Sequence, residues 1–236
     1  MFFFNICNLK NICDIILKGG KEIMKKGFIL GIVITIVSAI VAGWFAITAE
    51  GDVPINWNIH GEVNRYGSAW WMFIFPAISL FVTVLGCLIP KIDPKGDNIE
   101  KSGPILPVIM VMVSALMLGI QIFVIMAANG SDIMNLHVFI SLILGIMFIV
   151  MGYYTPRIKQ NYMLGIRTPW TLANEKVWTR THEVSKYWIM GGGLLFLASM
   201  FFNNVYSIIV PTVFIVVVAL GLVVYSYVLY LKEKKA

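Results

Sequence analysis

The sequence is poor in charge. Asp, Glu, Lys and Arg make up only 13% of its 236 residues, whereas hydrophobic residues make up 59% and the mean hydropathy is +0.84. A soluble domain usually carries about 25% charged residues. The composition therefore excludes an ordinary soluble domain and predicts an integral membrane protein.

Cysteine is also scarce, with three residues in the chain. Cys87 lies inside an apolar run, and Cys7 and Cys13 lie upstream of the first long apolar run. None of these positions indicates a disulfide framework.

Six apolar stretches follow one another, and none of them contains Asp, Glu, Lys or Arg. They are residues 28–47, 69–89, 104–128, 133–154, 187–202 and 205–231. A helical span needs about 20 apolar residues, and a charge at mid-membrane costs about 2.5–3.5 kcal/mol. The fifth stretch is short and must borrow a turn from the preceding segment, while the sixth is long enough to tilt. The predicted fold class is an all-α integral membrane protein with six transmembrane helices.

Basic residues are concentrated in alternate connections between these stretches. Of the 18 Lys and Arg residues, 17 lie on one side of the predicted bundle, and Arg65 alone lies on the other. Cytoplasmic loops are enriched in Lys and Arg. We therefore expect a multi-pass protein of the plasma membrane with both termini in the cytoplasm. The net charge of +6 is then an orientation signal, and no direct nucleic-acid partner is expected.

Residues 1–23 fit neither a span nor a signal peptide. The codons of Lys18-Gly19-Gly20 can contain a ribosome-binding sequence, at a suitable distance from a start codon at Met24. We expect these residues to be a misannotated leader, and the alternative is a short interfacial segment. Residues 24–236 then form one six-helix membrane domain.

The predicted outer loop, residues 48–68, contains His60 and three carboxylates. These groups can be interpreted as a metal or proton site, but none has the spacing of a helical ligand pair such as H-x-x-x-H. No metal ligand is therefore assigned. The favoured interpretation is an ordered cap with turns at Pro54 and Gly61, in which Asn56 and Asn58 satisfy backbone groups. Such a cap leaves a binding surface for an external ligand.

Gln121 and His137 are the notable polar residues inside the predicted spans. They can form the polar seam of a transporter or, more simply, hydrogen bonds between helices. We favour hydrogen bonds. The predicted cytoplasmic loop at residues 90–103 has mixed charge and shows no recognisable chemistry.

The longest polar interruption is the predicted cytoplasmic loop at residues 155–186. Its core, residues 165–172, reads Gly-Ile-Arg-Thr-Pro-Trp-Thr-Leu. Thr168 before Pro169, or Thr171, is suited to start a helix. At 100° per residue the following positions separate into an apolar and a polar arc. The first arc holds Val177, Trp178, Thr181, Val184, Ser185 and Trp188, and the second holds Glu175, Lys176, Arg180, His182, Glu183 and Lys186. This pattern predicts an interfacial amphipathic helix before the fifth span.

Two motifs in these loops resemble the signatures of the SdpI family of bacterial membrane proteins. The motif of the cytoplasmic loop consists of Gly165, Arg167, Thr168, Pro169, Trp170, Thr171, Glu175, Trp178 and His182. The motif of the outer loop resembles P-x-H-W-N-x-x-G-E and consists of Pro54, Trp57, Asn58, Gly61 and Glu62. Asn56 stands where the family commonly has His, which argues against histidine chemistry in this loop. The resemblance extends from about residue 24 to the C-terminus.

The resemblance implies a non-enzymatic protein that confers immunity to a secreted peptide toxin and relays its presence to a transcriptional repressor. The toxin would be met at the outer face and the repressor at the cytoplasmic loops. Arg167 would bond loop carbonyls or the C-terminal ends of neighbouring helices, which we favour, or grip a lipid phosphate or a partner's carboxylate. His182 with Glu175 or Glu183 lacks a nucleophile, so no catalytic residue and no cofactor is assigned.

The alternative is a small membrane transporter or lipid-handling protein. Such a protein would be expected to show inverted repeats with broken helices at matching positions. The sequence shows no convincing repeat between the first three and the last three apolar stretches, which favours the immunity interpretation.

Overall fold

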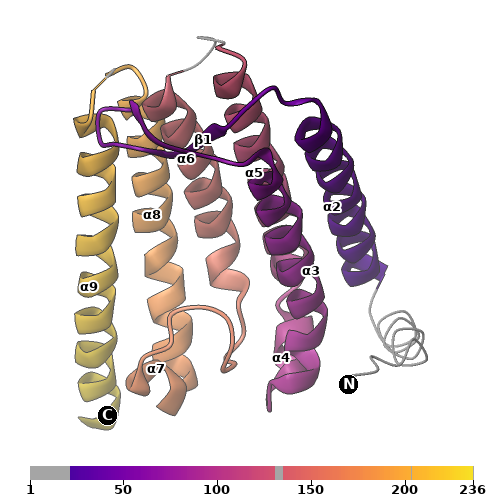
Figure 1. Cartoon of the computed structure of the whole chain (residues 1–236). Helices are drawn as coiled ribbons and strands as arrows, with labels where there is room; N and C mark the ends of the chain where they lie inside the picture. The colour runs from indigo at the N-terminus through magenta and orange to yellow at the C-terminus, as the bar shows by residue number, and fades with distance from the viewer. Residues whose placement is uncertain (1–21, 131–134, 203, 236) are drawn as a thin grey trace.

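The computed structural model describes residues 22–130, 135–202 and 204–235. In these residues six helices of 19 residues or more run side by side (Figure 1). They are α2 (Glu22–Thr48), α3 (Ile74–Ile92), α5 (Ile105–Ala128), α6 (Leu136–Tyr154), α8 (Glu175–Ser199) and α9 (Tyr206–Lys235). Successive long helices run in opposite directions, so α2 begins and α9 ends at the same end of the bundle. We call this the motif end, because residues 158–174 lie there, and the opposite end the hairpin end.

The helices explain the low charge of the chain. Five helical segments are long and apolar enough to span a membrane: residues 22–48, 69–92, 105–128, 136–157 and 206–235. Large apolar side chains such as Phe81 and Leu220 point out of the bundle, with 66% and 64% of their surface exposed. Outward apolar side chains are stable in a bilayer, where helices satisfy their own backbone groups. The chain is therefore a multi-pass, predominantly helical membrane protein, as predicted.

The interfacial helix predicted before the fifth span is continuous with the helix expected to form that span. α8 runs without a break from Glu175 to Ser199, and it packs along α6, η2 (Thr155–Arg157) and α7 (Pro169–Ala173). The predicted division of its faces is wrong at two positions. His182, assigned to the polar arc, is 1% exposed on the same buried face as Trp178 and Thr181. Trp188, assigned to the apolar arc, is 52% exposed. The charged residues of α8 all lie in its first half, and α8 is not among the five helical segments able to span a membrane. The fifth expected span, residues 187–202, therefore remains a prediction.

The predicted outer loop contains a small sheet that the all-α prediction missed. β1 (Val53–Trp57) pairs antiparallel with β2 (Val63–Gly67). η1 (Ala69–Phe73) then leads into α3, with Ser68 accepting a hydrogen bond from the backbone of Trp70. At the motif end, the loop between α3 and α5 contains the short helix α4 (Gly96–Lys101).

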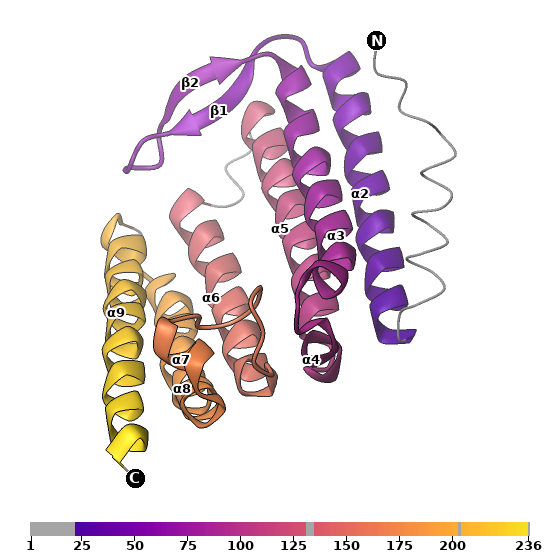
Figure 2. The same cartoon turned by 90° about the horizontal axis from the view of Figure 1, so that it is seen from below.

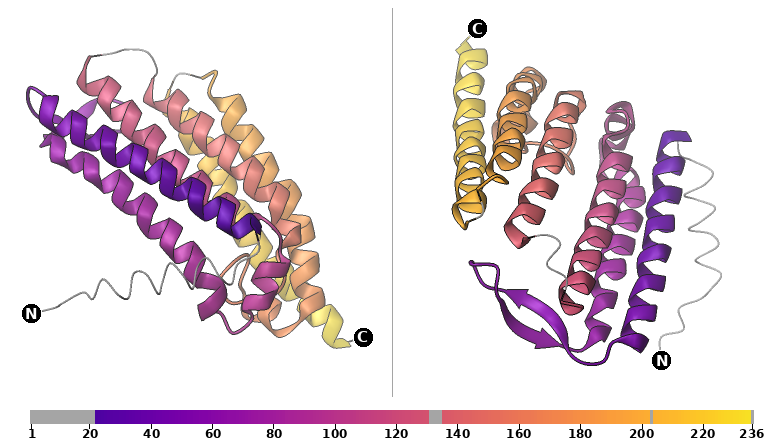
Figure 3. Two further views of the ribbon diagram at one scale, coloured as in Figure 1. Left: turned by 90° about the vertical axis from the view of Figure 1, so that its right-hand side faces the viewer. Right: turned by 90° about the horizontal axis from the view of Figure 1, so that it is seen from above.

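The bundle consists of two three-helix halves. α2, α3 and α5 pack together, and α8 packs against both α6 and α9, whereas α5 and α6 touch only sparsely. Figures 2 and 3 show the hairpin leaving the first half and reaching across the ends of the helices toward the second. The hairpin therefore covers the place where the halves meet.

Buried polar pairs join the helices of the first half. Gln121 Oε1 accepts a hydrogen bond from Ser38 Oγ at 2.5 Å, and its Nε2 donates to the Ser38 carbonyl at 3.0 Å. Thr35 and Ser79 hydroxyls lie 2.6 Å apart. These four buried side chains thus have partners, which offsets the cost of removing them from water. The predicted interhelical hydrogen bond of Gln121 is confirmed.

Candidate functional site

The hairpin turn is organised by Asn58. Its Oδ1 accepts hydrogen bonds from the backbone N–H groups of His60 at 2.9 Å and Glu62 at 3.0 Å. Its Nδ2 donates to Glu62 Oε2 at 2.9 Å. Gly61 has a φ of 84°, in the left-handed region that favours glycine. Three residues of the outer-loop motif therefore have a direct structural role in one turn, as the cap interpretation predicted for Asn58.

Histidine chemistry finds no support in this turn. His60 is exposed, and among the described residues no group of three or more His, Cys, Asp and Glu is arranged to hold a metal ion. Asn56 is exposed on β1, opposite Arg65.

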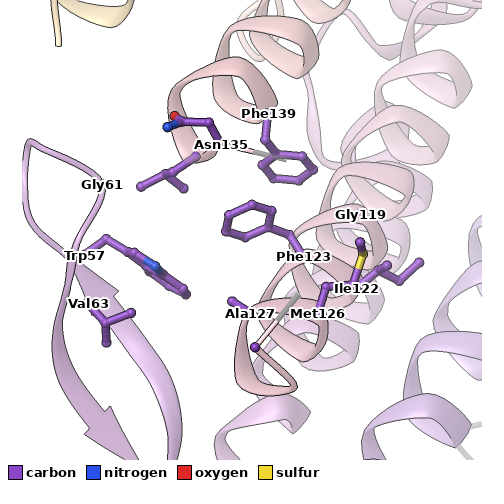
Figure 4. A pocket seen from close by; sticks show the side chains of 12 residues that line it. Trp57, Gly61, Val63, Gly119, Ile122, Phe123, Met126, Ala127, Asn135 and Phe139 are labelled. Atoms are coloured by element: carbon purple, nitrogen blue, oxygen red, sulfur yellow. The ribbon is translucent and has the colours of Figure 1, made fainter. Parts of the chain in front are cut away.

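Trp57 extends from the hairpin toward the helices beneath it. Its ring centroid lies 5.9 Å from that of Phe123 on α5, and Phe123 stacks on Phe139 of α6 at 4.6 Å. These rings border a cavity of about 490 Å³ between the hairpin, α5 and α6 (Figure 4). Gly119, Ile122, Met126 and Leu136 also line it. The volume and the apolar wall are typical of ligand pockets, which measure about 300–1,000 Å³.

A second cavity of about 430 Å³ lies on the other side of Trp57. Pro54, the first residue of the outer-loop motif, lines it together with Trp71, Ile120 and Arg65. Trp57 contributes to both walls and therefore separates two apolar spaces beneath the hairpin.

His137 lies under the hairpin turn, near the first cavity. Its side chain is 4% exposed, and a Cβ placed on Gly61 would lie 3.5 Å from its Nε2. Asn135 caps α6 by accepting a hydrogen bond from the His137 N–H at 2.8 Å. Within the described part of the chain His137 Nδ1 has no hydrogen-bond partner, so the hydrogen bond predicted for this ring is not seen at that atom.

At the motif end, Thr168 starts α7 as the sequence predicted. Thr168 Oγ1 accepts from the Thr171 N–H at 3.1 Å, and Thr171 Oγ1 accepts from the Thr168 N–H at 2.9 Å. Pro169 occupies the first helical position, where its missing N–H costs nothing. Asn174 then starts α8, because its Oδ1 accepts from the N–H groups of Lys176 and Val177. This second cap was not predicted from the sequence.

Trp178 and His182 form the buried centre of the motif. Their rings stack with centroids 4.3 Å apart, and Trp178 Nε1 donates to the Ile158 carbonyl at 2.7 Å. His182 Nε2 accepts from the Ile166 N–H at 3.0 Å, so Nδ1 carries the proton and donates to the Trp178 carbonyl at 2.8 Å. Burial lowers the pKa of His182 to about 4, although the hydrogen bond to the Trp178 backbone acts in the opposite direction. The neutral ring is therefore the form that this site holds.

Gly165 is required beside this ring. Its φ is +96°, and a Cβ there would collide with His182 Nε2. The glycine and the histidine of the motif are therefore parts of one contact.

The remaining motif residues connect the loop to itself and to α9. Arg167 Nη1 donates to the Tyr162 carbonyl, which agrees with the favoured role of bonding loop carbonyls. The Thr168 hydroxyl lies 3.0 Å from that of Ser226, and the Trp170 ring lies 4.9 Å from that of Tyr227. Glu175 is exposed in the first turn of α8.

The loop at residues 90–103, to which the sequence assigned no chemistry, holds the motif loop (residues 158–168) in place. Asp93 Oδ2 accepts from the Tyr162 N–H at 2.8 Å, and Ser102 Oγ accepts from the Lys159 N–H at 2.8 Å. Asn98 Nδ2 donates to the Gln160 carbonyl at 2.8 Å. Asp93-Pro94 and Ser102-Gly103 are recognisable as turns, but their partners 57–69 residues away are not visible in the sequence.

The two motifs thus lie at opposite ends of the bundle and do not form one site. The hairpin end offers apolar cavities, and the motif end offers a loop held by hydrogen bonds and surrounded by basic residues. Of the 15 Lys and Arg residues in the described ranges, 14 belong to elements at the motif end and Arg65 belongs to β2.

Comparisons with known proteins agree with both motifs. Residues 157–230 match the SdpI/YfhL protein family, and residues 30–80 match a domain of unknown function, DUF1648. The immunity protein SdpI of Bacillus subtilis (strain 168) is 24% identical over 184 residues, which cover 78% of this chain and 84% of that protein. No solved structure matches the chain. The resemblance seen in the motifs is therefore confirmed.

Proposed function

Because the chain is a distant homologue within the SdpI/YfhL family, we propose that it is a non-enzymatic immunity protein that protects its cell from a secreted peptide toxin. The observation that carries this proposal is the match to an immunity protein over 84% of that protein's length. The contacts of the two motifs are in keeping with this proposal, because they are structural hydrogen bonds and ring contacts.

The hairpin end is the proposed place of protection. A toxin that attacks the bilayer from outside meets the outer face first, and the positive-inside rule assigns the hairpin to that face. The cavities beside Trp57 supply apolar surface there. We therefore assign the toxin to the hairpin end.

The motif end is the proposed place of signalling. A cytosolic repressor is within reach of this end only, and its exposed residues include Tyr162, Met163 and Arg167. Trp178 is 1% exposed, so it acts by holding the loop and not by touching a partner. Sequestration of a repressor would then depend on the exposed residues, while the buried ones give the loop its shape.

The two roles should be separable by mutation. A strain that lacks the gene is complemented with the wild type, with Trp57→Ala, or with Tyr162→Ala combined with Met163→Ala. Cells are exposed to the secreted peptide fraction that kills the strain without the gene, and their survival is scored. In the same strains, a tagged repressor from a neighbouring gene is localised by microscopy. We expect the first variant to lose survival and the second to lose recruitment of the repressor to the membrane. Failure of the wild type to protect would refute the immunity function.

The transporter alternative loses its main support in the structure. Gln121 is fully bonded to Ser38 on α2, whereas His137 lies beneath the hairpin near Gly61. Among the described residues these two side chains have different neighbours, which favours the immunity proposal over a transporter.

A further inference from the structure

We infer that the cavity between Trp57, α5 and α6 is the receptor site for the toxin, and that the toxin is an apolar peptide with a net positive charge. This inference rests on the proposed immunity function and specifies its ligand. It follows from three features of the hairpin end: the cavity wall, the strand edges and the surrounding charge.

The cavity wall fits large apolar side chains. Trp57, Phe123 and Phe139 present aromatic rings to it, and Ile122, Met126 and Leu136 complete much of the surface. Met adapts its shape to different partners, and aromatic rings provide a large contact area. The cavity lies where α5 and α6 touch only sparsely, so an inserted side chain does not have to displace a packed core.

The hairpin supplies hydrogen-bonding groups that suit a peptide and not an acyl chain. Among the described residues its sheet consists of two strands, β1 and β2, so each strand has one edge without a ladder partner there. An extended peptide can bond such an edge through its main chain while its side chains enter neighbouring pockets. Trp57 and Val63, which are paired across the sheet, both line the cavity. A peptide on the hairpin would therefore have its side chains next to the cavity.

The charge around the hairpin selects the sign of the peptide. Within residues 48–73 the charged side chains are Glu50, Asp52, Glu62 and Arg65, all of them exposed. Three carboxylates against one guanidinium leave a net charge of −2. Glu50 and Asp52 border a further hollow of about 500 Å³ beside β1. This surface attracts a basic peptide and repels an anionic phospholipid headgroup.

Gly119 provides a way to fill the cavity without removing any existing contact. It lines the cavity from α5, and a Cβ there would make ordinary contacts at 3.7 Å to Ile143 and 4.0 Å to Phe139. Gly119→Leu should therefore place its side chain in the empty space. Gly191→Leu is the matched control, because nothing lies within 4 Å of a Cβ on Gly191 and this residue does not line the cavity.

The tolerated concentration of the peptide fraction that kills the strain without the gene is measured for cells with the wild type and with each full-length variant. The proteins are compared at equal abundance in the membrane. We expect Gly119→Leu to lower the tolerated concentration on the order of tenfold or more, since one buried large side chain contributes that factor in affinity. Gly191→Leu should protect like the wild type. Glu50→Gln with Asp52→Asn and Glu62→Gln should also lower tolerance and weaken its dependence on salt.

A second measurement identifies the occupant directly and does not depend on how Gly119→Leu folds. A photo-reactive benzoylphenylalanine replaces Phe123 or, as a control, the exposed Trp188. Cells treated with the same fraction are irradiated, and the adduct is identified by mass spectrometry. A peptide adduct at position 123 and none at 188 supports the inference. Only a phospholipid adduct at 123, or full protection by Gly119→Leu at normal abundance, overturns the receptor site while leaving immunity intact. A wild type that gives no protection refutes both.

Discussion

His182 Nε2 accepts a hydrogen bond from the backbone N–H of Ile166, 16 residues earlier, at 3.0 Å. The same ring stacks on Trp178, and the residue before Ile166 is a glycine with positive φ. The spacing between the Gly-Ile-Arg-Thr-Pro-Trp segment and the later Trp and His is therefore set by one contact between a loop and α8. This contact ties the shape of the motif loop to the protonation state of one side chain.

Acid should loosen this contact. The pKa of His182 is lowered by burial from 6.5 to about 4, so the unfolded chain takes up a proton in a pH range where the folded chain does not. The stabilising contribution is complete above pH 6.5 and is lost as the pH falls toward 4. Each pKa unit corresponds to about 1.4 kcal/mol, so the loss is on the order of 3 kcal/mol. Thermal unfolding in detergent at several pH values should show this decrease for the wild type, and a smaller one for His182→Gln.

Trp178→Phe should lower the free energy of unfolding by about 1–3 kcal/mol, because the buried Ile158 carbonyl loses its donor. The ring and its stacking on His182 are largely retained, which isolates the hydrogen bond. Trp188→Phe, at a side chain that is 52% exposed, should change stability by less than about 0.5 kcal/mol. Equal effects of the two substitutions on the melting temperature would contradict the assigned role.

Asp93→Ala should release the motif loop from the first half of the bundle. The change leaves the N–H groups of Tyr162 and Lys95 without their acceptor. Hydrogen–deuterium exchange should become faster over residues 159–164, while α9 stays protected. Asp97→Ala is the control, because Asp97 is exposed in α4. Unchanged exchange in the loop would show that Asp93 does not hold it.

The orientation follows from the distribution of basic residues and can be tested by labelling with an impermeant thiol reagent. In a background without the native cysteines, a cysteine at Asn64 should react from outside, and cysteines at Asp97 and Asn174 should not. In α4 the cysteine is placed at Asp97 and not at the adjacent Gly96, because a Cβ on Gly96 would collide with the Pro90 carbonyl. Reaction of Asn174→Cys in intact cells would reverse the expected topology.

Local signals in the sequence predicted the helices and their caps well. Five apolar stretches correspond to five helices able to span a membrane, because charge exclusion from a span is a property of each segment alone. Thr168 and Pro169 started α7 as expected, since a cap involves only neighbouring residues.

Contacts between distant residues were not predictable in the same way. The helical arc placed His182 with the charged side chains because the pattern treats histidine as polar, yet its two ring nitrogens are satisfied by backbone groups in the interior. Asp93 looked like part of a solvated turn because its partner lies 69 residues later. The hairpin was missed because Val53–Trp57 and Val63–Gly67 are short and irregularly paired.

Each half of the bundle is contacted by a segment of the other half, and these contacts have a consequence for biogenesis. The hairpin is synthesised with the first three helices, but it covers α6. The α3–α5 loop is also synthesised early, but it can form its hydrogen bonds only when residues 158–162 have emerged from the ribosome. A ribosome-bound chain that stops before α6 therefore carries an uncovered hairpin at one end of the bundle and unpaired polar groups at the other. Such a chain should be a good substrate for membrane proteases, so quality control in the cell would favour the completed protein over any truncated one.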